Sequence, residues 1–448
     1  MQPARDTIAA IATPPGTGGV AIIRISGRDA LAIGTRLSGK TPAPRRVTLA
    51  ALHDADGSLI DQGLLLYFPA PHSYTGEDTL EIHGHGGIAV SQTVLAAVLN
   101  AGARLAEPGE YSRRAYQNGK IDLAQAEAIA DLINARTAAA VKAATRSLQG
   151  AFSQEVNALA AELLALRAYI EAALDFPEEE NDYLSEGDLE ARLHHWGERL
   201  ARLLAQSTQG RLMNDGINLV IAGKPNAGKS SLLNALVGEE RAIVTAQAGT
   251  TRDIVRETLN IAGVPVNILD TAGLRDAADH IEQEGIRRTK QALTSADLIL
   301  LLVDGSTLAS GDDPAADLPP ETATTPRLLA YNKADQTPAD IQANHREGLW
   351  LSAKTGDGID ALRHAIAAAV GRDEREETPY IARERHLRAL KQAAQHHRDA
   401  LAQLHGARNG ELLAEDLRLA HDALGSITGA TSSDDLLGHI FSTFCIGK

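Results

Sequence analysis

The feature that most constrains the fold is an octapeptide, Gly-Lys-Pro-Asn-Ala-Gly-Lys-Ser, at residues 223–230. It follows an apolar run at residues 218–222 and precedes a helix-forming stretch at residues 231–237. A glycine-rich turn between a strand and a helix lets backbone N–H groups approach phosphate oxygens, and its lysine neutralises their charge. The pattern therefore predicts a phosphate-binding loop, with Lys229 on the β- and γ-phosphates.

Strand-like and helical patterns alternate from residue 214 to residue 371. Such alternation is typical of a parallel sheet that carries helices on both faces. Ligands of open α/β folds bind at the edge where the strands end. The apolar runs that we interpret as strands are at residues 218–222, 264–269, 298–303, 327–331 and 349–351.

Two motifs at the ends of predicted strands indicate that the bound base is guanine. They are Asn-Lys-Ala-Asp at residues 332–335 and Ser-Ala-Lys at residues 352–354. A carboxylate at Asp335 can accept the N1–H and 2-amino hydrogens of guanine, whereas adenine offers neither donor there. We expect the backbone of Ala353 to contact the guanine carbonyl. The sequence therefore predicts a GTP site.

The motif Asp-Thr-Ala-Gly at residues 270–273 completes the nucleotide set. We expect Ser230 and Thr251 to ligate Mg²⁺ and Asp270 to hold the ion through water. Leu274 stands where Ras-like proteins carry a water-orienting glutamine, so the catalytic group must come from elsewhere. The residues predicted to contact GTP are Asn226, Ala227, Gly228, Lys229, Ser230, Ser231, Thr245, Ala246, Gln247, Ala248, Gly249, Thr250, Thr251, Asp270, Thr271, Ala272, Gly273, Asn332, Lys333, Ala334, Asp335, Ser352, Ala353 and Lys354.

The rest of the chain predicts two further kinds of domain. Residues 1–118 combine strand-like runs with glycine and proline, which is typical of an α+β domain. Residues 119–213 and 372–448 carry apolar side chains at helical spacing. Since these helical stretches flank the nucleotide-binding segment at 214–371, we expect that α/β domain to be inserted into one helical domain. A chain of 448 residues is long enough for several cores.

The composition excludes several classes of protein. A net charge of -15 argues against a chain that coats nucleic acid by bulk electrostatics, because phosphate contacts need clustered Lys and Arg. The one cysteine, Cys445, allows neither a disulfide within the chain nor a cysteine zinc site. No apolar run approaches the roughly 20 residues that span a bilayer. We therefore expect a cytoplasmic protein without a membrane partner.

Four further stretches accompany the nucleotide motifs. They are Thr-Pro-Pro-Gly-Thr-Gly-Gly-Val at 13–20, Leu-Glu-Ile-His-Gly-His-Gly-Gly at 80–87, Asn-Gly-Lys-Ile-Asp-Leu-Ala-Gln-Ala-Glu at 118–127, and the tail Phe-Cys-Ile-Gly-Lys at 444–448. With this set, the chain resembles the MnmE (TrmE) family over essentially its whole length.

The resemblance implies a Ras-like P-loop GTPase domain inserted into a helical domain, preceded by a folate-binding α+β domain that dimerises. It implies potassium-dependent GTP hydrolysis and the addition of an aminomethyl or carboxymethylaminomethyl group to C5 of the wobble uridine 34 of certain tRNAs. A 5,10-methylene- or 5-formyl-tetrahydrofolate would supply the one-carbon unit. An MnmG-type FAD protein would join the homodimer in a heterotetramer and perform the redox step, because this chain lacks a Gly-x-Gly-x-x-Gly dinucleotide motif.

The resemblance also assigns individual residues. K⁺ would supply the cationic charge that an arginine finger supplies elsewhere, and Glu282 would orient the attacking water. The Cys-Ile-Gly-Lys tail would reach the folate site. The assigned residues are Asn226, Thr245, Gln247 and Thr250 for K⁺, Glu282 and Cys445 for catalysis, and Arg24, Glu81, Lys120 and Lys448 for folate.

Two alternatives compete with these assignments. Cys445 could be a small buried hydrophobe on a helix that begins at Ser433 and Asp434. The whole chain could be an Era-type ribosome-assembly GTPase, a binding switch that modifies nothing. Such a protein would carry a basic Gly-x-x-Gly module for RNA, whereas the C-terminal segment here is helical and acidic.

Overall fold

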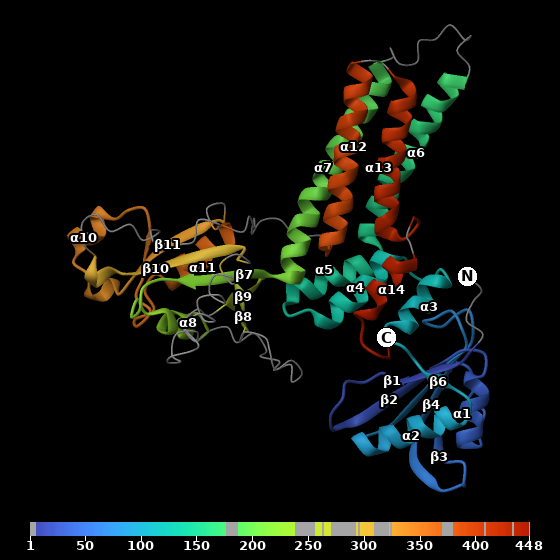
Figure 1. Ribbon diagram of the computed structural model, residues 1–448. Coiled ribbons are helices and arrows are strands. Elements are labelled where there is room, and N and C mark those ends of the chain that lie inside the picture. Colours follow the sequence, from blue (N-terminus) through green and yellow to red (C-terminus); the bar gives the residue numbers. More distant parts are fainter. Residues whose placement is uncertain are drawn as a thin grey trace, which may run out of the picture. The chain divides into compact units, whose positions relative to one another are not determined.

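The computed structural model describes residues 6–175, 187–237, 256–261, 264–269, 293, 296–308, 322, 325–369, 380–406, 409–431 and 434–447 (Figure 1). The chain divides into two compact units. The first comprises Met1–Ala130, Val156–Ala168 and Leu417–Lys448, and the second comprises Asp131–Glu155 and Tyr169–Asp416.

A sheet with three helices makes up the N-terminal part of the first unit. In chain order these elements are β1 (Ile8–Ile11), β2 (Gly18–Ser26), α1 (Ala30–Ser38), β3 (Thr48–His53), β4 (Leu59–Phe68), β5 (Thr79–Gly86), α2 (Ile88–Asn100), β6 (Arg104–Leu105) and α3 (Glu110–Gln117). The strand order is β3-β4-β5-β2-β1-β6. Only the β1–β6 pair is parallel. This is the α+β architecture that the sequence predicts.

Alternate residues of β2 and β5 face opposite sides of this sheet, as a period of two requires. Ile23 and Ile25 of β2 and Leu80 and Ile82 of β5 lie in one buried core, which also includes side chains from α1 and α2. The residue between the two isoleucines, Arg24, therefore points to the opposite face. That face carries a separate small core around Tyr111.

The C-terminal part of the first unit packs on its N-terminal part through apolar side chains. Helix α14 (Asp434–Ser442) contacts α3. Helix α14 ends at Ser442, so Cys445 lies beyond this helix and not within it. The same region holds an apolar core between α4 (Leu123–Asn134) and the C-terminal segment, against which Tyr116 of α3 packs. Its buried residues are Leu123, Ala126, Ile440, Phe441 and Phe444.

Two glycines permit the tail to approach the N-terminal part closely. Gly109 adopts a left-handed φ of 65°, and a Cβ there would overlap the carbonyl oxygen of Phe441. Gly447 has a φ of 97°, and its Cβ would lie 2.6 Å from the carbonyl oxygen of Ile11 in β1. Only glycine combines this conformation with such short backbone distances.

The second unit contains the alternating strands and helices. These elements are β7 (Ile217–Ala222), α8 (Lys229–Val237), β8 (Arg256–Ile261), β9 (Val264–Leu269), β10 (Leu298–Asp304), the 3-10 turn η2 (Gly305–Thr307), β11 (Arg327–Asn332), the 3-10 turn η4 (Ala334–Gln336), α10 (Ala339–Asn344), β12 (Leu349–Trp350) and α11 (Ile359–Ala369). The strand order is β12-β11-β10-β7-β9-β8, and only β8 runs antiparallel to its neighbour.

Every strand that the sequence predicts in this segment is present, but β8 is an additional strand. It lies at the sheet edge and alternates polar and apolar residues, Arg-Glu-Thr-Leu-Asn-Ile. Leu259 and Ile261 are buried on one face. The prediction relied on continuous apolar runs, which are typical of strands buried on both faces. A strand that alternates polar and apolar residues is not found in this way.

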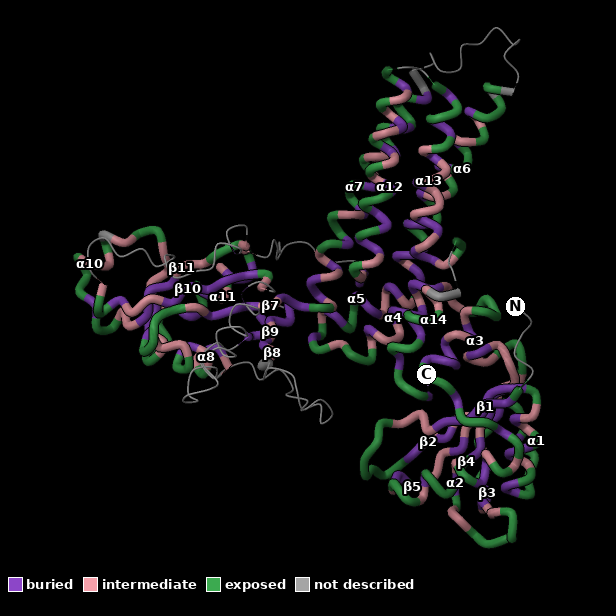
Figure 2. The backbone as a smooth tube through the Cα atoms, viewed as in Figure 1, coloured by how far each residue is buried: buried purple, intermediate pink, exposed green. Residues whose placement is uncertain are grey.

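The central strands β7 and β10 are buried along most of their length (Figure 2). Leu219 and Leu300 belong to a core that also contains side chains of α8 and α11. Val220 and Leu301 belong to a second core on the opposite face. The sheet therefore buries apolar side chains on both faces, as the alternation of strands and helices predicts.

Long helices form the remainder of the chain. They are α4 (Leu123–Asn134), α5 (Ala138–Leu148), α6 (Ala151–Asp175), α7 (Gly187–Asp215), α12 (Glu384–His405) and α13 (Gly410–Thr428). Helices α7 and α12 run side by side (Figure 1). Trp196 of α7 is fully buried against the ring of His397, whose Nε2 lies 2.8 Å from the carbonyl oxygen of Leu193. Gly197 leaves room for this imidazole.

The α/β segment leaves and re-enters the helical part at neighbouring points. It begins two residues after α7 ends at Asp215, and the returning Tyr380 donates its hydroxyl to Gln206 Oε1 of α7 at 2.7 Å. The next residues are fixed by an Arg383–Asp131 ion pair at 2.6 Å. The predicted insertion is therefore confirmed. Among the helices of the described residues, none is both long enough and apolar enough to span a membrane.

Replacement of Gly109 by alanine tests how tightly the tail is packed. Gly109 and Gly119 share a φ of 65°, but an added Cβ meets nothing within 4 Å at Gly119. Both alanine variants should carry the left-handed penalty of about 1–2 kcal/mol, and Gly109→Ala should lose about 1–3 kcal/mol more through overlap with Phe441. Thermal unfolding of the full chain measures the difference. Equal destabilisation of the two variants would contradict this packing.

Candidate functional site

The loop at residues 223–228 has the backbone of a phosphate cradle. Asn226 adopts a left-handed φ of 66°, which asparagine tolerates better than most residues. Gly228 has a φ of 93°, and a Cβ there would overlap the side-chain amide of Asn332. Helix α8 begins directly afterwards at Lys229. Backbone N–H groups at a helix N-terminus, together with its dipole, favour a bound anion.

The cation of Lys229 lies over this loop. Its Nζ donates to the carbonyl oxygens of Gly223 at 2.9 Å and Lys224 at 3.1 Å. The exposed side chains of Ser230 and Ser231 follow in the first turn of α8. The cradle, the lysine and the adjacent hydroxyls fit a nucleotide polyphosphate with its Mg²⁺, which would take Ser230 as a ligand.

Asn332 connects the phosphate loop to the predicted base-binding motifs. Its buried amide donates from Nδ2 to the carbonyl oxygen of Ala227 at 2.8 Å. Its Oδ1 accepts the backbone N–H of Ala353 at 3.0 Å. Asn332 therefore fixes two loops from different parts of the sequence. The Ala353 N–H, which we expected to meet the guanine carbonyl, is engaged with Asn332 in this structure.

Asp335 presents an exposed carboxylate at the same edge of the sheet. Ser352 Oγ donates to its Oδ1 at 2.7 Å, and this hydrogen bond lowers the pKa of Asp335 below its ordinary value. The group is therefore ionised at neutral pH and can only accept hydrogen bonds. Such a carboxylate is suited to two parallel N–H donors on one edge of a base.

Asp304 is a site residue that the sequence analysis missed. Its Oδ2 lies 2.6 Å from Lys333 Nζ. Burial raises the pKa of Asp304, but hydrogen bonds from Lys333 and Ser306 outweigh it and lower the pKa overall. The ion pair holds Lys333, whose φ is 64°, beside the base-binding loop. An acidic residue directly after the strand predicted at residues 298–303 was the signal that could have identified Asp304.

Several predicted nucleotide and ion residues lie outside the described residues, and their assignments stay predictions. They are Thr245, Ala246, Gln247, Ala248, Gly249, Thr250, Thr251, Asp270, Thr271, Ala272, Gly273 and Glu282, together with the predicted folate ligand Lys448.

A second candidate site lies on the face of the N-terminal sheet opposite α1 and α2. Arg24 and Glu81 are direct cross-strand partners in the β2–β5 register. Arg24 Nε donates to Glu81 Oε1 at 2.9 Å, and the other oxygen of Glu81 lies 3.1 Å from His83 Nε2. The side chains of Arg24 and Glu81 are 23% and 15% exposed, so both are partly desolvated but reachable.

Strand β2 and the C-terminal tail meet at Arg24. Its NH1 donates to the carbonyl oxygen of Gly447 at 3.4 Å, across 423 residues of sequence. The guanidinium carbon lies 5.6 Å from the ring centroid of Tyr74 and 5.8 Å from that of Tyr111. Burial raises the pKa of Tyr111, whose hydroxyl donates to the Arg24 carbonyl oxygen at 2.6 Å. Neither tyrosine was singled out from the sequence.

Lys120 and Cys445 have different positions around this site. Lys120 Nζ donates to the carbonyl oxygen of Pro71 at 3.0 Å, and no hydrogen bond joins it to Arg24 or Glu81 in the described part of the chain. Cys445 is an exposed free thiol. The alternative that this cysteine is a buried hydrophobe is therefore wrong, because the helix ends before it and its side chain faces solvent.

His83 and His85, two residues apart on β5, contact different acidic partners. His83 contacts Glu81, whereas His85 Nδ1 lies 2.7 Å from Asp61 Oδ1. The two histidine side chains therefore contact different carboxylates and share no common partner in these contacts.

Family comparisons identify the protein's relatives. The model described as "GTP-binding protein TrmE N-terminus" matches residues 7–120, and the "MnmE helical domain" model matches residues 123–445. The tRNA modification GTPase MnmE of Dichelobacter nodosus is 56% identical and covers 99% of this chain and 100% of its own length. The protein of the same name from Stutzerimonas stutzeri is 52% identical, with both chains covered in full.

The chain belongs to the MnmE family of tRNA modification GTPases. The resemblance stated from the motifs is confirmed, as is the prediction of a GTP hydrolase that takes part in tRNA modification. Among solved structures, the G domain of the T. maritima FeoB iron transporter is 23% identical and covers 34% of this chain and 98% of its own, with a TM-score of 0.23. A score of that size supports no structural conclusion.

Asp335→Asn should change the base preference from guanine to xanthine, because an amide donates where the carboxylate only accepts. GTP affinity should fall about 5- to 150-fold, which corresponds to about 1–3 kcal/mol for one unsatisfied hydrogen-bond partner. Equilibrium binding of GTP and XTP measures the change. Asp340→Asn is the matched control, because it makes the same change from carboxylate to amide at an exposed position on α10. Unchanged GTP affinity without a gain for XTP would withdraw Asp335 from base recognition.

Proposed function

We propose that this chain is a potassium-dependent GTPase that, with an MnmG-type FAD partner, adds an aminomethyl or carboxymethylaminomethyl group to C5 of the wobble uridine 34 of tRNA. The observation that carries the proposal is the contact of Arg24 with both Glu81 and the Gly447 carbonyl. It joins the N-terminal sheet to the cysteine-bearing tail at one surface. The name of the relatives, tRNA modification GTPase, supports the part of the proposal that concerns GTP hydrolysis and a tRNA substrate.

The N-terminal site fits a reduced folate. A pterin offers ring donors that a carboxylate such as Glu81 can accept, and the folate carboxylates need cations. Arg24 and Lys120 provide such charges on the first unit, and Lys448 follows Gly447 in sequence. The rings of Tyr74 and Tyr111 add flat apolar surface next to Arg24. When bound, 5,10-methylene- or 5-formyl-tetrahydrofolate would supply the one-carbon unit.

The GTP site would use the residues assigned from the sequence. Lys229 and the loop N–H groups would hold the phosphates, and Asn332 and Asp335 would position the guanine. Ser230 and Thr251 would bind Mg²⁺, which neutralises phosphate charge. Glu282 would orient the attacking water, since Leu274 replaces the Ras-type glutamine.

K⁺ selection would depend on Asn226 together with Thr245, Gln247 and Thr250. The left-handed φ of Asn226 and its exposure on the phosphate loop support a role for its side-chain oxygen as a ligand. An ion at this point supplies positive charge where negative charge develops during hydrolysis.

A homodimer is the proposed assembly, with an MnmG-type protein and tRNA as further partners in the cytoplasm. Leu49 and Leu64 are cross-strand partners on β3 and β4, and both are exposed, at 55% and 37%. Exposed Val47 lies two residues before Leu49, next to the start of β3. Contiguous exposed apolar residues near a sheet edge favour a protein interface. The proposed domain limits are 1–118, 119–213, 214–371 and 372–448.

GTP hydrolysis should be at least about tenfold faster in KCl than in NaCl at equal ionic strength, because a placed cation acts mainly in the transition state. Asn226→Gly should remove most of this stimulation while glycine keeps the left-handed φ of that position. Single-turnover rates in both salts, with nucleotide affinity as the control, measure the effect. Equal rates in the two salts would remove K⁺ from the proposal.

Cys445→Ser should abolish or sharply reduce uridine modification while GTP hydrolysis continues. Because Cys445 is exposed, stability should change by less than about 0.5 kcal/mol. Mass spectrometry of tRNA nucleosides from a deletion strain that carries each variant measures modification, and GTPase rate and melting temperature are measured on the same proteins. Ser442→Ala, an exposed neighbour, is the control. Normal modification in the Cys445→Ser strain would withdraw this thiol from the reaction.

A further inference from the structure

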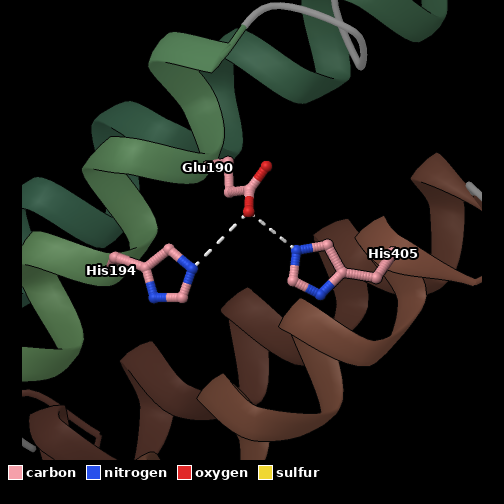
Figure 3. A group of neighbouring side chains, drawn as sticks. All are labelled: Glu190, His194 and His405. Carbon is pink, nitrogen blue, oxygen red and sulfur yellow. Dashed lines mark hydrogen bonds and ion pairs between the residues drawn. The ribbon is translucent and has the colours of Figure 1, made fainter.

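We propose that Glu190, His194 and His405 form a site for a divalent transition-metal ion of the zinc class, which joins helices α7 and α12 (Figure 3). The sequence analysis did not single out these residues, and none of them belongs to the GTP or folate assignments. All three lie in the second unit.

Local geometry brings the three side chains together. Glu190 and His194 are four residues apart on α7, so they lie one above the other on the same helix face. His405 is the last residue of α12, and α12 runs alongside α7. Figure 3 shows the carboxylate of Glu190 between the two imidazoles. The site therefore uses residues that are 215 positions apart in sequence but adjacent in the fold.

The distances between the ligand atoms suit a small metal ion. Glu190 Oε1 lies 3.0 Å from His405 Nε2 and 3.7 Å from His194 Nε2. Tetrahedral zinc with bonds of about 2.0–2.1 Å requires ligand atoms about 3.3 Å apart. The two measured distances fall on either side of this value. All three ligand atoms lie within 4.8 Å of one another, so small rotations of the side chains would complete the geometry.

The donor set indicates which ion would bind. Two imidazole nitrogens and one carboxylate oxygen suit Zn²⁺ and its transition-metal neighbours, whereas Mg²⁺ and Ca²⁺ prefer oxygen ligands alone. The side chains of Glu190, His194 and His405 are 49%, 55% and 53% exposed, so water can take the fourth position. The C-terminal end of α12 carries partial negative charge, which also favours a cation at His405.

The charge state of the carboxylate is already suitable. The hydrogen bond with His405 lowers the pKa of Glu190 below its ordinary value. Glu190 is therefore ionised at neutral pH and need not release a proton before it coordinates a metal. Glu190 already contacts both imidazoles that would become its fellow ligands.

A second group, His396, Asp399 and Asp416, also brings three possible ligand atoms together, but it is less suited to zinc. It offers one imidazole instead of two. Asp399 Oδ1 already accepts a hydrogen bond from Gln395 Nε2 at 2.9 Å. His396 therefore provides a discriminating variant for the experiment, because it tests whether binding belongs to this second group.

The proposal is tested by calorimetric titration of Zn²⁺ into the full-length chain after treatment with a chelator. We expect one Zn²⁺ to bind, and we expect His194→Ala and His405→Ala each to weaken its affinity at least about tenfold. His195→Ala is the matched control, because His195 is the exposed neighbour on the same helix but is not in the cluster. The His396→Ala variant should also bind Zn²⁺ with the affinity of the unchanged protein. Circular dichroism and GTPase rate should be unchanged in every variant.

Co²⁺ absorption spectra provide an independent measurement, because imidazole and carboxylate ligands give ligand-field bands without thiolate charge transfer. We expect such a spectrum, and we expect it to be lost in His194→Ala and His405→Ala. Four results would overturn the proposal. They are no Zn²⁺ binding, unaltered Zn²⁺ affinity in both His194→Ala and His405→Ala, an equal loss of affinity in His195→Ala, or a loss of Zn²⁺ binding in His396→Ala. A thiolate spectrum would also overturn it, since that would place the metal on Cys445.

Discussion

The amide of Asn332 is the interaction on which the nucleotide site depends. Its Oδ1 accepts the backbone N–H of Ala353, and its Nδ2 donates to the carbonyl oxygen of Ala227. This single buried side chain therefore sets the distance between the base-binding loop and the phosphate loop. Gly228 has no Cβ because that atom would occupy the position of the Asn332 amide. The requirement for glycine in the phosphate loop thus has two physical origins: its backbone conformation and a close approach to Asn332.

The parallel sheet makes this arrangement possible. Strands β7, β10 and β11 run parallel, so their ends deliver the phosphate loop, Asp304 and Asn332 to the same edge. Burial on both faces by alternating Leu, Val and Ile fixes the strand register, because a shift of one residue would exchange the two cores. The Lys333–Asp304 ion pair then links neighbouring loops at that edge.

The first unit uses a different principle to build its candidate site. Arg24 and Glu81 face away from the main core and form a cross-strand pair, and the tail of the chain supplies the Gly447 carbonyl to the same arginine. Apolar packing of Phe441 and Phe444 holds the preceding helix, and left-handed glycines at 109 and 447 allow the close approach. The exposed Cys445 lies between these anchored points.

The sequence by itself determined the α/β segment, its insertion into helices, the nucleotide motifs and the family, because these features are local patterns with fixed spacing. It did not reveal the edge strand β8, Asp304, Tyr74 or the exposure of Cys445. Only the tertiary structure decided which distant residues meet: Arg24 with Gly447, and Glu190 with His405. Those contacts depend on strand register and helix packing, which arise from the sum of many side-chain contacts rather than from any one motif.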